Sequence, residues 1–307
     1  MELVMLTGVP ASGKSREAEK YRMMGYRIHS SDAIRQELYG SEGIQGRAPE
    51  VFKTLVGRTR LDLQEGFPCV IDASNLRRRR RMASLNNLRL QNVKKTCVIV
   101  LSSPETLLER NRKRSRVVPD RSIHEMLCSF EAPYFYEGWD EIRYVYNDGP
   151  YRFPREAAAS FDQENPFHAL TLGAHLDTAR EYARANGFSP SVQEAAWYHD
   201  IGKMYTRSFQ TRSGEATAYA HYYGHENYGA YLYLCEMLST AARENRWRET
   251  LYIACLINWH MCFLNKWPQN PGSRENDRKL MGEEMFRELE QLSRADAFAH
   301  ERSLRFE

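Results

Sequence analysis

The sequence predicts an α/β domain, with a parallel sheet and helices on both faces, followed by an all-helical domain. Apolar, strand-like runs alternate with helical patterns through the first half, which is typical of βαβ units. After residue 147 the strand signals stop, and glycine and proline punctuate residues 148–165. A chain of 307 residues is long enough for two domains, which we expect at residues 1–150 and 160–307.

The expected elements follow from local hydrophobic patterns. Strands are expected at residues 2–7, 25–30, 67–74, 95–102 and, with a weaker pattern, 142–147. Helices between them are expected at residues 14–24, 48–65, 77–91 and 104–114. The second half shows helical patterns throughout, with breaks near residues 186–190, 211–217 and 266–273.

The composition indicates a cytoplasmic protein that handles polyanions. There is no apolar run long enough to span a membrane, and the first residues form an expected strand rather than a leader peptide. The six cysteines are scattered without a C-x-x-C pair, which fits reduced thiols. Residues 1–150 carry 25 Lys+Arg against 19 Asp+Glu, whereas seven of nine histidines follow residue 160. A basic half and a histidine-rich half favour phosphate binding joined to a metal site.

Residues Gly8–Ser15 match the pattern G-x-x-x-x-G-K-S/T between an expected strand and an expected helix. Such a loop turns its backbone N–H groups, here those of Gly8, Ser12 and Gly13, toward phosphate oxygens. Lys14 is expected to reach the β- and γ-phosphates, and Ser15 to bind Mg²⁺. The pattern predicts ATP or another NTP with Mg²⁺ as cofactor.

Two acidic residues follow expected strands, at the sheet edge where such domains hold ligands. Asp32 can accept a proton from an attacking hydroxyl, and Arg35, three residues later, can hold a substrate phosphate. The alternative for Asp32 is a helix N-cap. Asp72 is expected to organise Mg²⁺ through water, with Asn75 closing the same turn; the alternative is a simple turn residue.

Two arginine-rich segments complete the first half. Arg110, Arg112, Arg114 and Arg116 resemble a lid that neutralises the transferring phosphoryl group, with one or two of them acting and the others solvated. Residues 77–81 are all arginine and spread over every face of a helix. This run is either a solvated helix start or a contact to a phosphate backbone.

Residues 1–147 resemble the phage-type 5′-hydroxyl polynucleotide kinases. The resemblance rests on the Gly8–Ser15 loop, the Ser30–Arg35 and Asp72–Asn75 motifs, and the Arg110–Arg114 lid. It implies that Asp32 is the general base for a 5′-hydroxyl and that Arg35 grips the neighbouring substrate phosphate. It also implies that Arg110 and Arg114 contact the NTP phosphates.

Histidines and aspartates of the second half lie in separate helical segments. Such ligands, converging in a bundle, suit an octahedral site for Mn²⁺, Fe²⁺, Mg²⁺, Co²⁺ or Ni²⁺, and the lack of cysteine ligands argues against structural zinc. The segment resembles the HD superfamily of metal-dependent phosphohydrolases over about residues 165–300. The resemblance implies the ligands His175, His199, Asp200 and Asp296, a second metal at His225 and His260, and Lys203 facing the substrate phosphate. His168 and His221 are candidates for supporting the metal ligands or binding phosphate.

Together the two resemblances imply a bifunctional enzyme that heals RNA or DNA ends. It would phosphorylate a 5′-hydroxyl and remove a 3′-phosphate or 2′,3′-cyclic phosphate, leaving ends for a nucleic-acid ligase. The D-x-D-x-T/V motif of the phage phosphatase is absent from the sequence, so the HD half would replace it. One alternative is a nucleoside or metabolite kinase fused to an HD nucleotidase. Another is a regulatory NTP- and metal-binding module without turnover.

Overall fold

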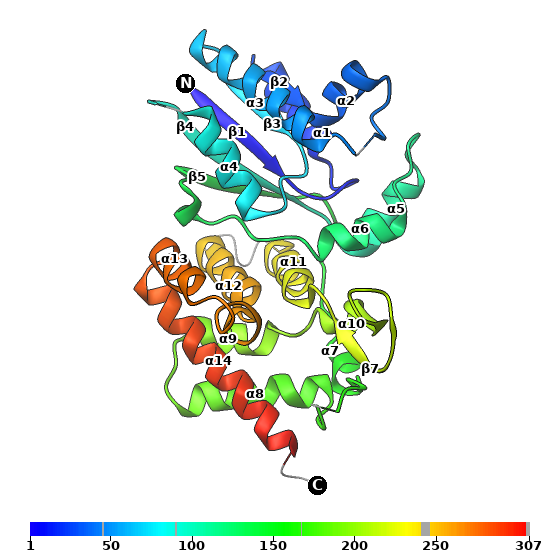
Figure 1. The fold of residues 1–307 in the computed structure, drawn as a ribbon, viewed down its shortest axis with the longest axis vertical. Helices are drawn as coiled ribbons and strands as arrows, with labels where there is room; N and C mark the ends of the chain where they lie inside the picture. The colour runs from blue at the N-terminus through cyan, green and yellow to red at the C-terminus, as the bar shows by residue number, and fades with distance from the viewer. Residues whose placement is uncertain (45, 90, 167, 241–245, 305–307) are drawn as a thin grey trace. The chain divides into compact units, whose positions relative to one another are not determined.

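The computed structural model describes residues 1–304 apart from residues 45, 90, 167 and 241–245 (Figure 1), so Leu90 of the helix expected over 77–91 lies outside the described residues. The chain forms two compact units. Unit 1 comprises Met1–Met126 and Pro133–Gly149, and unit 2 comprises Leu127–Ala132 and Pro150–Glu307.

Unit 1 is built on a five-stranded parallel sheet. Its strands are β1 (Glu2–Thr7), β2 (Arg27–Ser30), β3 (Cys69–Asp72), β4 (Lys94–Leu101) and β5 (Glu141–Tyr146). Their order in the sheet is β2-β3-β1-β4-β5, and every neighbouring pair is parallel. The prediction of a parallel α/β sheet is confirmed, and the carboxyl ends of all five strands meet at one edge.

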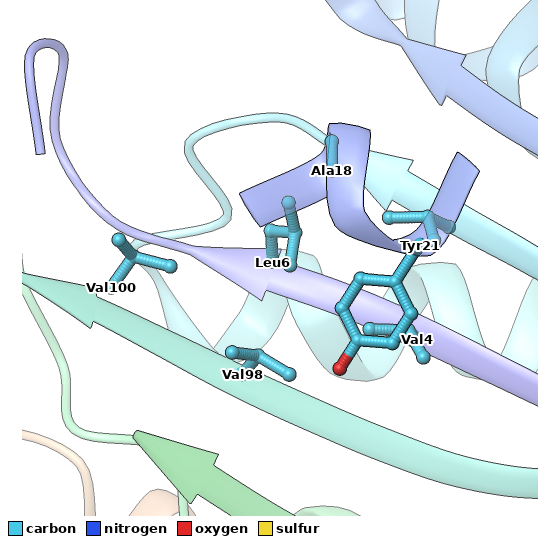
Figure 2. Packing of buried hydrophobic residues seen from close by; sticks show 7 residues of the cluster. Val4, Leu6, Ala18, Tyr21, Val98 and Val100 are labelled. Carbon is cyan, nitrogen blue, oxygen red and sulfur yellow. The ribbon is translucent and has the colours of Figure 1, made fainter. Parts of the chain in front are cut away.

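Both faces of this sheet are buried. Successive side chains of a strand point to opposite faces. Leu3 and Met5 therefore lie on the face opposite Val4 and Leu6, yet all four are 0% exposed. This two-sided burial explains why the central strands are continuous apolar runs rather than alternating ones. On the face covered by helix α1 (Lys14–Met23), the packed cluster comprises Val4, Leu6, Ala18, Tyr21, Val70, Val98 and Val100 (Figure 2).

Besides α1, unit 1 contains α2 (Ser31–Tyr39), α3 (Ala48–Gln64), α4 (Arg78–Leu88), α5 (Pro104–Arg112) and α6 (Asp120–Leu127), with a 3₁₀ turn at Phe135–Glu137. Helices α1, α3, α4 and α5 lie close to the expected ranges, whereas no range was predicted for α2 or α6. Helix α4 is shorter than the expected span of 77–91. It ends at Leu88 because Arg89 adopts a left-handed conformation with φ of 51°, which helices commonly use to terminate.

The run of five arginines divides into different roles. Arg81 is 0% exposed, and its guanidinium donates two hydrogen bonds to the Glu137 carboxylate, at 2.6 and 2.7 Å. It also donates to the backbone carbonyls of Asn75 and Leu76. Arg79, by contrast, is exposed. Both earlier interpretations of the run therefore miss Arg81, whose role is to anchor α4 and the turn after β3.

Unit 2 is mostly helical. Its helices are α7 (Arg155–Ala159), α8 (Leu172–Ala185), α9 (Pro190–Tyr198), α10 (Lys203–Thr206), α11 (His225–Leu238), α12 (Trp247–Trp259), α13 (Pro271–Met281) and α14 (Glu283–Leu304), with a π-helical turn at Cys262–Lys266.

The prediction of an all-helical second half is wrong at one place. Strands β6 (Arg207–Gln210) and β7 (Ala216–Tyr222) form an antiparallel hairpin. The break expected near residues 211–217 is the hairpin turn, where Thr211 N–H donates to Glu215 O and Gly214 adopts φ of 90°. The flanking strands are short, which is why their pattern did not separate them from helix.

A short segment of the first half belongs to unit 2 by its contacts. Asn258 accepts a hydrogen bond from Ala132 N–H and donates one to Phe130 O, at 2.8 and 2.9 Å. Asn227 donates to Cys128 O at 2.9 Å. These bonds satisfy backbone groups of a segment without regular structure, and no local sequence pattern indicates them.

The described helices and the cysteines bear on two features of the composition. None of their helices is both long and apolar enough to cross a membrane. All six cysteines are free, and four of them are buried.

The buried Arg81–Glu137 pair predicts unequal effects for neighbouring arginines. Arg81→Ala leaves a buried carboxylate without its partner, so it should lower the free energy of unfolding by about 3–5 kcal/mol. Arg79→Ala, a matched change at an exposed position of the same helix, should change it by less than about 0.5 kcal/mol. Urea unfolding of the full chain, followed by circular dichroism, measures both. Equal effects would contradict an anchoring role for Arg81.

Candidate functional site

The loop Gly8–Ser15 connects β1 to α1 and depends on two close approaches. A Cβ on Gly8 would lie 2.5 Å from Val100 O, at the end of the neighbouring strand β4. A Cβ on Gly13 would lie 2.7 Å from the Asn147 amide nitrogen, and Gly13 has φ of 100°. Only glycine fits at both positions. Gly13 caps α1 without a side-chain hydrogen bond, so the first N–H groups of the helix remain available for an anion.

Lys14 is the half-buried cation of this loop. Its Nζ donates a hydrogen bond to Val9 O at 2.9 Å. Burial lowers the pKa of Lys14 to about 8, and the carboxylates of Asp72 and Asp32 oppose this effect only partly. Burial also raises the pKa of Asp72, against the attraction of Lys14. Both groups therefore lie in a site that is short of compensating charge until a phosphate and a cation bind.

Asp32 and Arg35 lie on the first turns of α2 and form an ion pair. The distance from Arg35 Nη1 to Asp32 Oδ1 is 2.6 Å. The Arg35 side chain is 8% exposed and that of Asp32 46%, so the carboxylate faces open space while the guanidinium is held inside. The alternative that Asp32 caps the helix is wrong, because the Ser30 hydroxyl accepts the hydrogen bond from Ala33 N–H and is the cap.

The arginines of the expected lid differ in their contacts. Arg110 donates to Ser102 Oγ at 2.9 Å and to Asn147 O, which fixes it beside the phosphate loop. Arg116 approaches Glu42 at 3.2 Å and Asp32 at 3.8 Å. Arg112 instead pairs with Asp120 in an exposed ion pair. Three of the four, Arg110, Arg114 and Arg116, line the cavity described below, whereas one or two were expected to act; which of them act stays a prediction.

A cavity of about 770 Å³ brings these groups together. It is lined by the predicted site residues Gly13, Lys14, Ser15, Asp32, Arg35, Asp72, Arg110 and Arg114. Gly8, Ser12 and Asn75 are not among its lining residues. The Asn75 amide donates to Leu6 O at 2.8 Å, and its φ of 46° completes the turn after β3. The arrangement can hold a triphosphate and Mg²⁺ at one end and a hydroxyl near Asp32 at the other.

The candidate metal site of unit 2 is a buried cluster from five segments. His175 comes from α8, His199 and Asp200 directly follow α9, His225 begins α11, and His260 directly follows α12. Asp296 comes from α14 and is also buried. The predicted ligands are thus brought together, in two groups: His175, His199, Asp200 and Asp296 form one, and Asp200, His225 and His260 form the other.

Asp200 joins the two groups through different oxygens. Its Oδ2 lies 3.4 Å from His175 Nε2 and 3.5 Å from His199 Nε2. Its Oδ1 lies 3.0 Å from His225 Nε2 and 3.5 Å from His260 Nε2. A carboxylate with one oxygen in each group is suited to bridging two cations.

Hydrogen bonds fix the tautomers so that lone pairs converge. The Nδ1 atoms of His199, His225 and His260 lie 2.6–2.8 Å from backbone carbonyl oxygens, which can only accept. Each Nδ1 therefore carries a proton, so when a ring is neutral its Nε2 is the atom that presents a lone pair. His225 Nε2 and His260 Nε2 are only 3.2 Å apart. A divalent metal beside the Asp200 carboxylate would satisfy both nitrogens, so these residues fit such an ion.

Asp296 supports the same interpretation for the first group. Its buried Oδ1 lacks a hydrogen-bond partner of good geometry, yet it lies 3.2–3.4 Å from His175 Nε2 and His199 Nε2. Burial alone would raise the pKa of Asp296, but the surrounding imidazoles hold it well below its usual range. The same balance, led by Lys203 and His199, keeps the pKa of Asp200 low. Both carboxylates are therefore ionised, as metal ligands must be.

Close helix packing positions the Asp200 turn. A Cβ on Gly202 would lie 2.1 Å from His225 O and 2.7 Å from Gly229 N, so only glycine lets this turn approach α11. The next residue, Lys203, places its Nζ 2.7 Å from Asp200 Oδ2, 2.9 Å from Gln163 Oε1 and 3.2 Å from His168 Nε2.

The remaining histidines separate into one that joins the site and one that does not. Burial and the adjacent Lys203 lower the pKa of His168 to about 2, so it is neutral beside the cluster. His221 instead stacks on Tyr223 in the hairpin, at 5.4 Å between ring centroids.

Sequence reasoning missed His300. This residue lies 3.3 Å from Asp296 Oδ1 and forms a group with His168 and His175. Its spacing of four residues from Asp296 on one helix was the available signal, because such residues share a helix face. Gln163 was missed as well, and it lies in an irregular segment where no spacing rule applies.

Comparisons with known proteins give one family model and several solved structures. Residues 3–133 match the family model described as an AAA domain. Unit 1 is a P-loop kinase-like domain. A gluconokinase from Sinorhizobium meliloti 1021 is 21% identical over 47% of this chain and 82% of its own, with a TM-score of 0.35. A sugar kinase from Janibacter sp. HTCC2649 is 19% identical over 48% and 85%, with a TM-score of 0.36. The tunicamycin resistance protein of Deinococcus radiodurans is 15% identical over 61% and 96%, with a TM-score of 0.33. No curated protein matches the chain.

The lowered pKa of Lys14 predicts a pH-dependent affinity for NTP. Below pH 8 the free protein already carries the cation, whereas above it a proton must be taken up when the triphosphate binds. The dissociation constant should therefore rise by up to about tenfold per pH unit above pH 8. Titration of a fluorescent NTP between pH 7 and 10 measures this. Lys14→Arg, which stays charged throughout this range, should flatten the profile; an unchanged slope would contradict the assignment.

The bridging position of Asp200 predicts that its loss affects both metal groups. Asp200→Ala removes one oxygen from each, so Mn²⁺ or Ni²⁺ retained after dialysis should fall to background in metal analysis. His225→Ala should lose only the metal of the second group and keep one ion per chain. Asp277→Ala is a matched control, because this buried carboxylate binds Lys266 and Trp267 instead. Full metal retention by Asp200→Ala would contradict a bridging role, because it would mean that neither metal group needs this carboxylate.

Proposed function

We propose that the chain is a bifunctional phosphoryl-transfer enzyme. Unit 1 transfers the γ-phosphoryl group of an NTP to a hydroxyl acceptor, and unit 2 is a metal-dependent phosphohydrolase of the HD type. The observation that carries the kinase half is the Asp32 carboxylate, which lines the same cavity as the phosphate loop and Lys14. A triphosphate on the loop and a hydroxyl at Asp32 would meet inside this cavity.

Each side chain of the kinase site has a role in this transfer. Lys14, Arg110 and Arg114 hold the triphosphate, and Ser15 and Asp72 hold Mg²⁺, which draws charge from the phosphate oxygens. Asp32 takes the proton of the acceptor hydroxyl. The hydroxyl oxygen of the acceptor forms a bond to the γ-phosphorus, and the bond between the γ-phosphorus and the β–γ bridging oxygen breaks. Arg35 fixes Asp32 through the 2.6 Å ion pair and offers its remaining donors to the acceptor.

The acceptor is itself anionic in this proposal. Seven arginine or lysine side chains and three carboxylates line the cavity. The resulting excess of four positive charges is larger than the charge of about −2 on a magnesium-bound triphosphate. An acceptor that carries a phosphate near its hydroxyl would neutralise the remainder.

The phosphohydrolase half rests on the converging Nε2 lone pairs around Asp200. Divalent cations held there polarise a phosphoryl oxygen and make water a stronger nucleophile. Lys203 holds Asp200 in place at 2.7 Å, and its other two N–H groups face Gln163 and His168. It would therefore contribute positive charge to a phosphate at the edge of the cluster, beside the rings of His168 and His300. The tight packing of Gly202 against α11 keeps this geometry fixed.

Two classes of acceptor fit the kinase half. A small phosphorylated molecule, with unit 2 acting as a nucleotidase, is supported better, because the family match concerns a kinase-like domain and carries no indication of nucleic-acid end healing. The contacts of Arg116 with Asp32 and Glu42 also join the two sides of the cavity, which suits a compact acceptor.

A nucleic-acid end is the second candidate, with end healing ahead of a ligase as the cellular role. It is favoured by the exposed Arg77 and Arg79, which neighbour the cavity-lining Arg80 on α4 and could contact a phosphate backbone.

The proposed base gives a direct test. Asp32→Asn removes the proton acceptor, so phosphorylation should fall by about 10²–10⁴-fold, while phosphate release by unit 2 is unchanged. Asp120→Asn, another exposed carboxylate paired with an arginine, is the matched control and should retain activity. Radiolabelled transfer from NTP to 5′-hydroxyl oligonucleotides, nucleosides and sugar phosphates, singly and in competition, measures the loss and ranks the acceptors. Substantial transfer by Asp32→Asn would remove this residue from the mechanism.

A further inference from the structure

The acceptor side of the cavity contains one stacked pair that the proposed transfer does not use. The guanidinium carbon of Arg80, on α4, lies 4.4 Å from the centre of the Phe52 ring, on α3. Both side chains line the 770 Å³ cavity. Phe52 is the one aromatic residue among the described lining residues, which are otherwise mostly charged or small.

Arg80 also differs from its neighbours in how its charge is balanced. Arg35 and Arg116 each contact a carboxylate within 4 Å. Among the described residues, no carboxylate lies within ion-pair distance of Arg80, and its partner is the π face of Phe52. Arg80 is an exposed residue, but partial desolvation together with the nearby cations Arg77 and Arg35 lowers its pKa. An uncompensated cation beside a second one is a place where an anion binds favourably.

We infer that Phe52 and Arg80 form an acceptor-recognition subsite that takes a planar ring, stacked on the pair, and a phosphate held between Arg80 and Arg35. This inference rests on the proposed kinase function and narrows its acceptor to nucleotides that offer a free hydroxyl. Aromatic rings and guanidinium planes are the surfaces on which nucleobases stack in proteins. A sugar or polyol phosphate would satisfy the arginines but leave Phe52 unused.

A planar base, a phosphate and a free hydroxyl are found together both in a mononucleotide and at the end of a nucleic acid strand. Phe52 and Arg80 would contact only the terminal base and its phosphate, so the subsite accommodates a mononucleotide or a strand end. The two are therefore distinguished by experiment, with a nucleoside 3′-phosphate and a short 5′-hydroxyl oligonucleotide as separate acceptors.

The test compares acceptors with and without a ring on the full-length protein. The wild type should phosphorylate a nucleoside 3′-phosphate with a higher kcat/KM than ribose phosphate, which lacks the base. Phe52→Leu should lower kcat/KM for the nucleotide by about tenfold or more, as expected for a lost base–aromatic stack, and leave ribose phosphate unaffected. Phe52→Trp, which keeps the stacking surface, should restore the preference.

Arg80→Gln should act on the phosphate instead of the base. It should raise KM about equally for nucleoside 3′-phosphate and ribose phosphate, without changing KM for NTP. The matched control is Phe67→Leu. Phe67 also stacks under an arginine, with Arg27 at 3.4 Å from its ring centre, but it does not line the cavity. Its loss should alter no acceptor parameter. Thermal unfolding of each variant separates a recognition defect from a folding defect.

The outcomes separate the two proposals. If the wild type phosphorylates ring-bearing and ringless acceptors equally, or if Phe52→Leu weakens both to the same extent, the kinase stands and the subsite is overturned. If the wild type phosphorylates none of them while still binding NTP, the kinase proposal itself fails and the subsite with it. A preference for the oligonucleotide over the mononucleotide, or the reverse, identifies the source of the nucleotide while supporting the subsite.

Discussion

A buried charge is stable only beside a compensating charge or hydrogen bond, and both units are organised around this constraint. In unit 1 the half-buried Lys14 is balanced incompletely by Asp72 and Asp32, and its lowered pKa reflects this shortfall. In unit 2 the buried Asp200 is surrounded by imidazoles whose protons point away from it. Each site therefore needs a ligand that supplies the compensating charge. In unit 1 this ligand is phosphate with Mg²⁺, and in unit 2 it is metal cations.

The Arg81–Glu137 pair shows the opposite solution to the same constraint. There the guanidinium is matched fully, with two hydrogen bonds to a carboxylate and two more to backbone carbonyls, and both side chains are 0% exposed. A fully matched pair is a structural anchor and has no capacity left for a ligand. The contrast with Lys14, Arg80 and Asp200 provides a physical criterion for separating structural charges from functional ones within one chain.

The two sites also differ in how much their geometry can adapt. The kinase cavity is formed by loop and helix ends at one edge of a rigid sheet, and its arginines are long side chains, of which Arg116 is one-third exposed. The metal cluster is formed by short side chains inside a helical bundle, where Gly202 allows the backbone of one turn to contact the next helix. Phosphoryl transfer between two substrates benefits from a site that closes around them. A metal site benefits from ligands that are held in place beforehand.

The sequence by itself determined most of the secondary-structure elements of unit 1 and which residues share a face of one helix or strand. The parallel sheet, the phosphate loop and the placement of Asp32 and Arg35 on one helix face follow from periodicity and from spacings of two to four residues, which are set by helix and strand geometry. The order of strands, the burial of Arg81 and the hairpin at residues 207–222 were not predicted, because they depend on partners distant in sequence. The same is true of the site details: His300 joins Asp296, Phe52 lies under Arg80, and Asp200 turns one oxygen toward each group of histidines. The sequence supplied the chemical groups of both sites, whereas only tertiary packing decided which atoms face each other, because distances between segments are fixed by the burial of the whole core and not by local backbone geometry.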